Sequence, residues 1–224
     1  MKLSRAVSIV DRVGIALVYP LKAAGKKAPE VPSLWGELYP RSTMEWRWDE
    51  DADPRVAEVW HLREVLARSA EVAYAKWFRG RATFFSLPVF HALLGALAES
   101  GDVFGGLPRE SHEILDALRE RSPRSTKELR KEVGLQGRPF ESLYAHATKA
   151  LWSRLLIVGI GEIDDGAFPS LAVAATETMF EDLWLARHDV PARARAKLAE
   201  SLSRTPAFAR QLEKAQREIA EGGA

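Results

Sequence analysis

The hydrophobic residues of the C-terminal half recur first at helical spacing and then at strand spacing. A helix is predicted over residues 109–120, with Ile114, Leu115 and Leu118 on one face. A longer helix is predicted from Pro139 onward, with an apolar stripe of Leu143, Ala147, Ala150, Leu151 and Leu155. Two apolar runs follow at 156–162 and 167–174, and the Asp165-Gly166 pair between them is typical of a hairpin turn.

A short helix is predicted between these two helices. Ser122-Pro123 ends the first helix, and Ser125 with Glu128 three residues later has the pattern of a capping box. Gly134 ends the short helix. Three helices followed by a hairpin is the order of a winged helix-turn-helix, in which the third helix enters the major groove of DNA.

The N-terminal half predicts a mixture of helices and strands. A short helix from residue 6 runs into a strand at 15–19, and the Gly, Pro and Lys content of 23–32 predicts a loop. Asp53 is a predicted N-cap, followed by Pro54 in a helix that continues to about Arg68. Residues 72–85 predict two strands joined by a tight turn at Arg79-Gly80. A further helix is predicted from Pro88 to Gly101.

The stretch 101–108, with three glycines and a proline, is the best candidate for a domain boundary. We therefore expect an α+β fold in which a winged helix-turn-helix unit at 106–182 packs on a mixed α/β part at 1–105. Residues 183–224 are expected to form a helical C-terminal extension. Because Ala and Arg are ordinary residues of helix surfaces, the part from Pro191 onward is interpreted as a solvated, amphipathic appendage, and contact with DNA phosphates is the alternative. Its last residues are expected to fray.

A net charge of +1 conceals an uneven distribution of charge along the chain. Residues 37–58 contain seven acidic and three basic side chains, whereas residues 119–154 contain nine basic and four acidic ones. Neutralisation of DNA phosphates requires such a basic excess. The distribution favours double-stranded DNA as the partner, and a solvated basic face is the alternative.

The candidate DNA contacts lie on and around the last two predicted helices. We expect five residues to face the DNA groove: Arg138, Ser142, His146, Lys149 and Ser153. Arg124 and Lys127, before and within the short helix, are expected to hold phosphates. Winged helices also mediate protein interactions, so a protein-interaction module is an alternative function.

A second backbone contact is predicted at the turn between the two N-terminal strands. The basic residues Lys76, Arg79 and Arg81 are interleaved there with aromatic ones, namely Tyr74, Trp77 and Phe78. Such a mixture can clamp a nucleic-acid backbone and stack on an exposed base. In the alternative interpretation, the aromatic side chains face the core and the charges face water.

Five short strings of the chain resemble the AlkZ-type winged-helix proteins, and the resemblance extends over about residues 6–180. The strings are Asp11-Arg12-Val13-Gly14, Pro32-Ser33-Leu34-Trp35, Tyr74-Ala75-Lys76, Arg81-Ala82-Thr83 and LLIVGIGE at 155–162. This family includes DNA glycosylases that unhook interstrand crosslinks, and shorter relatives of unassigned activity. The resemblance implies binding of duplex DNA through winged-helix elements, in DNA repair or transcriptional control.

The glycosylases of this family use a Gln-x-Gln motif. This chain contains only Gln136, Gln211 and Gln216, so it has no such pair. The sequence also lacks the nucleophile-elbow, zinc-protease and phosphate-loop motifs. No catalytic residue is therefore assigned, and a DNA glycosylase acting on alkylated or crosslinked bases is kept as an alternative function.

The composition limits the kinds of site and the location that the protein can have. Without Cys the chain has no disulfide and no zinc site of the Cys type, and His146 has no His or carboxylate at i+3 or i+4 to complete a metal pair. We expect neither a metal nor a cofactor. Charged residues such as Asp11 and Arg12 interrupt each apolar run before it reaches the ~18 residues of a membrane span, which predicts a cytoplasmic protein.

Overall fold

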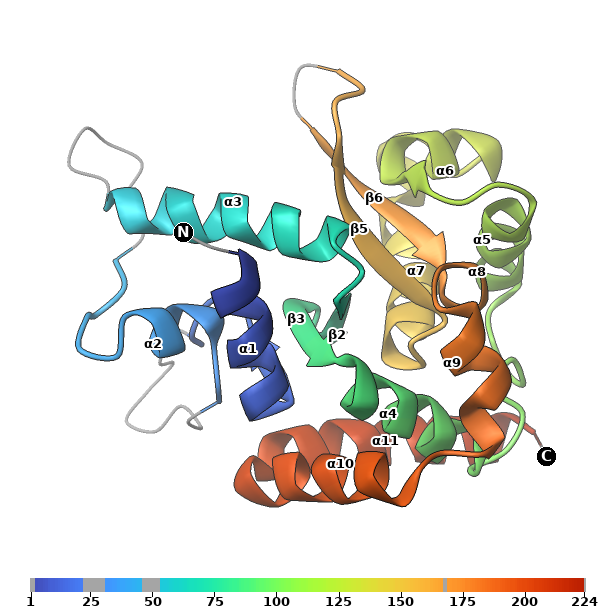
Figure 1. Cartoon of the computed structure of the whole chain (residues 1–224). Coiled ribbons are helices and arrows are strands. Elements are labelled where there is room, and N and C mark those ends of the chain that lie inside the picture. Colours follow the sequence, from blue (N-terminus) through green and yellow to red (C-terminus); the bar gives the residue numbers. More distant parts are fainter. Residues whose placement is uncertain (1–2, 22–30, 46–52, 167–168, 224) are drawn as a thin grey trace.

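Two small antiparallel sheets with helices around them form the fold (Figure 1). The computed structural model describes residues 3–21, 31–45, 53–166 and 169–223, so most of the loop predicted at 23–32 lies outside the described residues. The mixed α+β composition predicted from the sequence is confirmed.

The first sheet has the strand order β1–β3–β2. Its strands are β1 (Ile15–Leu17), β2 (Val72–Phe78) and β3 (Arg81–Ser86). The tight turn predicted between β2 and β3 is confirmed, because Arg79 and Gly80 have φ angles of 51° and 70°. Two consecutive positive φ angles are typical of the type I′ hairpin turn. This turn holds the exposed side chain of Arg79 at the tip of the ribbon.

Three helices lie in the same half of the chain, namely α1 (Leu3–Val13), α2 (Leu34–Leu38) and α3 (Pro54–Arg68). Helix α1 packs against β3, α3 packs against β2, and α2 packs against α1. The predicted passage from a helix into a strand near the N-terminus is confirmed by α1 and β1. The predicted cap of α3 is also confirmed, since the Asp53 carboxylate accepts a hydrogen bond from the backbone N–H of Arg55 at 3.0 Å. The short helix α2 was not predicted.

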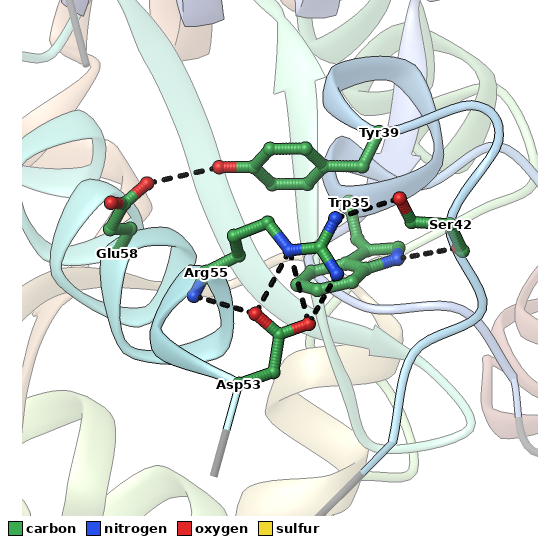
Figure 2. A network of polar contacts seen from close by, with 6 residues as sticks. All are labelled: Trp35, Tyr39, Ser42, Asp53, Arg55 and Glu58. Atoms are coloured by element: carbon green, nitrogen blue, oxygen red, sulfur yellow. Dashed lines mark hydrogen bonds and ion pairs between the residues drawn. The ribbon is translucent and has the colours of Figure 1, made fainter. Parts of the chain in front are cut away.

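The Arg55 side chain connects the start of α3 to the segment around α2 (Figure 2). Its Nη2 donates to Asp53 Oδ2 at 2.6 Å, and its Nη1 donates to Ser42 Oγ at 2.7 Å. The guanidinium carbon also lies 5.5 Å from the ring centroid of Trp35 and 5.2 Å from that of Tyr39. The residue that caps α3 therefore also positions α2, through Arg55.

The second sheet has the strand order β4–β6–β5. Its elements in chain order are α5 (Arg109–Glu120), β4 (Arg124–Ser125), α6 (Thr126–Glu132), a 3-10 turn (Arg138–Phe140), α7 (Glu141–Ser153), β5 (Ile157–Ile163) and β6 (Ser170–Ala175). The predicted order of three helices and a hairpin is confirmed. The capping box is confirmed as well: Ser125 Oγ accepts from the N–H of Glu128, and the Glu128 carboxylate accepts from the N–H of Ser125, both at 3.0 Å. The strand β4 was not predicted.

The C-terminal elements are α8 (Thr176–Met179), α9 (Glu181–Leu185), a 3-10 turn (Ala186–His188), α10 (Ala192–Arg204) and α11 (Pro206–Gly222). Helix α8 packs against β5, β6 and α9, whereas the elements from α9 onward pack against α4 (Leu87–Ala98), with α10 and α11 at the bottom of Figure 1. The ring centroid of Phe208 in α11 lies 5.1 Å from that of Phe78 and 5.9 Å from that of Trp77. The interpretation of this segment as a solvated appendage is therefore wrong, because one face of it is buried in the core.

Strand β5 packs against β2 and joins the two sheets. Gly159 lies so close to the ring of Tyr74 that a Cβ atom at this position would overlap the ring. Arg63 of α3 forms an ion pair with Glu162 of β5 across the same junction. One cluster of buried side chains continues from the first sheet through α7 to α11, so the boundaries at 105 and 182 remain predictions.

Candidate nucleic-acid interface

A groove of about 870 Å³ lies between the β2–β3 turn, α7 and α11. Strand β2 and the turn after it contribute Lys76, Trp77 and Arg79 to its lining, α7 contributes His146, Lys149 and Ser153, and α11 contributes Gln211, Lys214 and Glu218. Five of the residues predicted to contact DNA are thus brought together from two distant parts of the sequence. Contact of the C-terminal helix with DNA was the less favoured alternative, because nothing in the sequence relates that helix to the turn.

Basic side chains outnumber acidic ones along the groove. The lining includes six Lys or Arg residues, namely Lys76, Arg79, Arg130, Lys149, Arg154 and Lys214, and two acidic residues, Glu218 and Glu221. His146 and Lys149 are exposed, and within the described ranges neither forms an ion pair with a carboxylate. These two side chains are accessible to an anion in the groove.

Helix α7 presents this face because its opposite face is held in the core. Ala147, Leu151 and the following Leu155 are fully buried, as the apolar stripe predicts. Such a stripe fixes the rotation of the helix about its axis, so the residues between its members point away from the core. His146 and Lys149 face the groove for this reason.

The aromatic residues of the β2–β3 ribbon lie in the core. Tyr74, Trp77 and Phe78 are each 2 % exposed, so stacking of these rings on an exposed base is excluded and the inward-facing alternative is correct. The Arg79 guanidinium is exposed and its carbon lies 5.2 Å from the ring centroid of Phe78. At this ribbon a ligand can therefore contact the positive charge of Arg79, but not the faces of Tyr74, Trp77 or Phe78.

Two polar groups of the groove lining were missed by the sequence analysis. The indole N–H of Trp77 is buried and has no hydrogen-bond acceptor. Burial raises the pKa of Tyr144 to about 12, although the charge of Arg130, whose guanidinium carbon lies 4.4 Å from the centroid of that ring, acts in the opposite direction. The Tyr144 phenol is therefore neutral at physiological pH. The sequence analysis considered Trp77 only for stacking on a base, and no sequence signal distinguished Tyr144 from an ordinary core aromatic.

Arg124 is buried, contrary to the expectation of a free phosphate contact. Its Nη1 lies 3.1 Å from the Glu132 carboxylate and its Nη2 lies 3.5 Å from that of Glu120. Its Nε donates to the backbone carbonyl of Arg121 at 3.1 Å. A guanidinium with these partners holds α5, β4 and α6 together and is not presented to a phosphate. Lys127 remains exposed, and its Nζ donates to the Asp165 carbonyl at 2.6 Å.

The other predicted contacts lie outside the groove lining. Arg138 and Ser142 are exposed at the start of α7. Arg81 is exposed and lines a separate, smaller pocket, which it shares with Lys76. The predicted residues thus form one group in the groove, one at the start of α7 and one at the smaller pocket.

Within residues 3–21, 31–45, 53–166 and 169–223, no group of three or more His, Asp or Glu side chains lies in a position to hold a metal ion. No helix there combines the length and the apolar character that crossing a membrane requires.

The fold and the groove define an α+β protein with a basic cleft between a strand turn and two helices. The chain belongs to the AlkZ-related family, whose model matches residues 2–217. This match confirms the resemblance found in the sequence and links the chain to DNA repair. No curated protein and no solved structure matches the chain.

Proposed function

We propose that the chain binds duplex DNA through a winged helix-turn-helix unit formed by α5 to β6. The order of helix, strand, two helices and two strands supports this assignment. So does the sheet, in which β6 pairs with β4 on one side and with β5 on the other. In such a unit α7 enters the major groove and the β5–β6 hairpin is the wing.

One observation carries the proposal: the β2–β3 turn and α7 place their basic residues along a single groove. Lys76 comes from β2 and Arg79 from the turn, while His146 and Lys149 come from α7. A polyanion in this groove would meet cations from both walls, and each neutralised phosphate would release condensed counterions. Arg138 and Ser142 extend the proposed surface along the start of α7, and Arg124 is left out of it.

The experiment is an anisotropy titration of a labelled duplex at several salt concentrations. The double variant Arg79→Gln/Lys149→Gln removes one charge from each wall. Each lost phosphate contact should flatten the slope of log affinity against log salt by about 0.9. Arg193→Gln is the matched control, because Arg193 is an exposed residue of α10 outside the groove lining. Wild-type affinity and slope in the double variant would contradict the proposal.

A glycosylase is the second candidate, and the acidic residues of the groove favour it. The lining includes Glu218 and Glu221 of the α11 region, and a carboxylate beside a bound strand can activate water for attack on a damaged nucleotide. Incubation with alkylated duplex, followed by alkaline cleavage, would then nick the strand in the wild type and not in Glu218→Gln or Glu221→Gln. If stoichiometric protein binds the duplex and no nick forms, the protein binds DNA but is not a glycosylase on this substrate. No affinity for nucleic acid, with a stable oligomer by light scattering, would identify a protein-interaction module.

A further inference from the structure

A second pocket, of about 310 Å³, lies beside the groove. Its wall contains Trp60 and Arg63 of α3, Tyr74 and Lys76 of β2, Arg81 of β3 and Glu162 of β5. Lys76 lines both cavities, whereas Arg79 lines only the groove and Arg81 lines only the pocket. The volume is near the lower end of the range for small-molecule sites, roughly 300 to 1,000 Å³.

Arg63 is the buried cation of this pocket. Its side chain is 4 % exposed, it pairs with the Glu162 carboxylate, and its guanidinium carbon lies 3.9 Å from the ring centroid of Trp60. Its Nε–H is buried and has no acceptor among the residues that the structure describes. Buried donors are nearly always satisfied in folded proteins. An acceptor atom brought by a ligand would complete the hydrogen bonds of this side chain.

Two further cations face the pocket without a counter-charge of their own. Among the described residues, neither Lys76 nor Arg81 forms an ion pair. Burial, and then the charge of Arg63, lower the pKa of Lys76. Like charges held together in this way favour the arrival of an anion.

The balance of charge in the pocket indicates which kind of anion fits. Arg63, Lys76 and Arg81 face the single carboxylate of Glu162, which leaves an excess of two positive charges. A phosphate monoester carries about −1.5 to −2 at neutral pH, whereas an internal phosphodiester of a nucleic acid carries only a single charge. The half-exposed Trp60 beside these cations provides a surface for a planar group attached to the phosphate.

We propose that this pocket binds a phosphate monoester, with Arg63, Lys76 and Arg81 around the phosphate and Trp60 beside the group that carries it. The monoester belongs either to a free nucleotide or to the 5′ end of a DNA strand that lies in the groove. The free-nucleotide form is independent of the proposed function, whereas the strand-end form rests on it.

Isothermal titration calorimetry with deoxyadenosine 5′-monophosphate and with deoxyadenosine tests the free form. The nucleotide should bind and the nucleoside should not. Arg81→Gln should weaken nucleotide binding by about tenfold, because it removes a charge-assisted contact. Arg79→Gln is the matched control and should leave nucleotide binding unchanged, since Arg79 does not line the pocket.

Two duplexes that differ only in a 5′-phosphate or a 5′-hydroxyl test the strand-end form in the anisotropy titration. The phosphorylated duplex should bind more tightly, and Arg81→Gln should abolish this preference while Arg79→Gln keeps it. Arg81 is exposed, so its substitution should leave the fold intact, and Lys76→Gln is the second variant if it does not.

The proposal is overturned if phosphate confers no advantage on either the nucleotide or the duplex, or if Arg81→Gln and Lys76→Gln both retain that advantage. Failure of the proposed function gives a different result, in which no duplex binds while the nucleotide still does.

Discussion

Arg154 Nη1 donates a hydrogen bond to the backbone carbonyl of Val103 at 2.9 Å, across 51 residues of sequence. The same nitrogen donates to the Gly105 carbonyl at 2.6 Å, and Nη2 donates to the Glu218 carbonyl at 3.3 Å. Arg154 therefore connects the end of α7 both to the loop before α5 and to α11. Since α7 and α11 form two sides of the groove, this residue sets the distance between them.

Replacement of Arg154 by Met should destabilise the protein and change the groove. The variant leaves the carbonyls of Val103, Gly105 and Glu218 without their donor, and we expect the free energy of unfolding to fall by about 2 kcal/mol. Urea denaturation measures this loss, and duplex affinity should fall with it. The opposite result, wild-type stability in Arg154→Met, would show that water replaces the guanidinium at no cost.

Substitutions of Arg124 and Lys149 should affect different properties: the first the stability of the protein, and the second the salt dependence of duplex binding. Arg124→Gln removes a buried guanidinium from Glu120 and Glu132, so it should lower the free energy of unfolding by about 2 kcal/mol and leave the salt dependence of duplex binding unchanged. Lys149→Gln should leave the stability unchanged and flatten the salt dependence by about 0.9. Each variant is the control for the other, and an exchange of the two phenotypes would reverse the assignment.

Gly159→Ala should weaken the junction between the two sheets. The added Cβ would overlap the buried ring of Tyr74, and crowding of this kind in a packed core costs about 1–3 kcal/mol. The loss is measured as a lower midpoint of thermal unfolding. Gly166→Ala is the matched control, because its added Cβ would approach only the flexible end of Lys127. Equal midpoints for the two variants would argue against close packing at Gly159.

The stability of the α3 cap should depend on pH in one direction. Hydrogen bonds from the Arg55 side chain lower the pKa of Asp53 below its ordinary value of 3.8. A carboxyl group whose pKa is lower in the folded state stabilises the protein above its unfolded pKa and loses this effect as the pH falls through the folded pKa. Wild type should therefore be more stable than Asp53→Asn at neutral pH, and the difference should shrink as acid is added. Thermal melts across that range measure it, and a constant difference would show that the charge has no part in it.

The features that the sequence predicted correctly depend on local chemistry. Asp53 followed by Pro54, and Ser125 followed by Glu128, satisfy the free backbone groups at a helix start whatever the rest of the chain does. The Arg79-Gly80 turn likewise depends on a local property, because Gly80 adopts a positive φ angle without steric cost. Apart from α2 and β4, the order of helices and strands from α1 to β6 agrees with these short-range requirements.

The features that the sequence did not predict depend on contacts between distant residues. Arg124 has the same charge as Lys149, but β4 pairs Arg124 with Val173, and the Arg124 side chain is buried whereas that of Lys149 is exposed. Strand β4 is two residues long and exists because β6 pairs with it. Both outcomes follow from packing that hydrophobic spacing does not encode.

The contact of Phe208 with Trp77 and Phe78 also bears on how such a protein can diversify. Phe208 of α11 packs against the buried side of the β2–β3 ribbon. Substitutions at the exposed tip of the ribbon therefore alter the charge that a ligand meets without requiring a change in the core. Arg79 and Arg81 are exposed on either side of Gly80, whereas Gly80 itself has a φ angle of 70°, which disfavours a side chain at that position. New binding preferences are therefore most readily acquired at this tip, while the helix behind it is constrained to keep its shape.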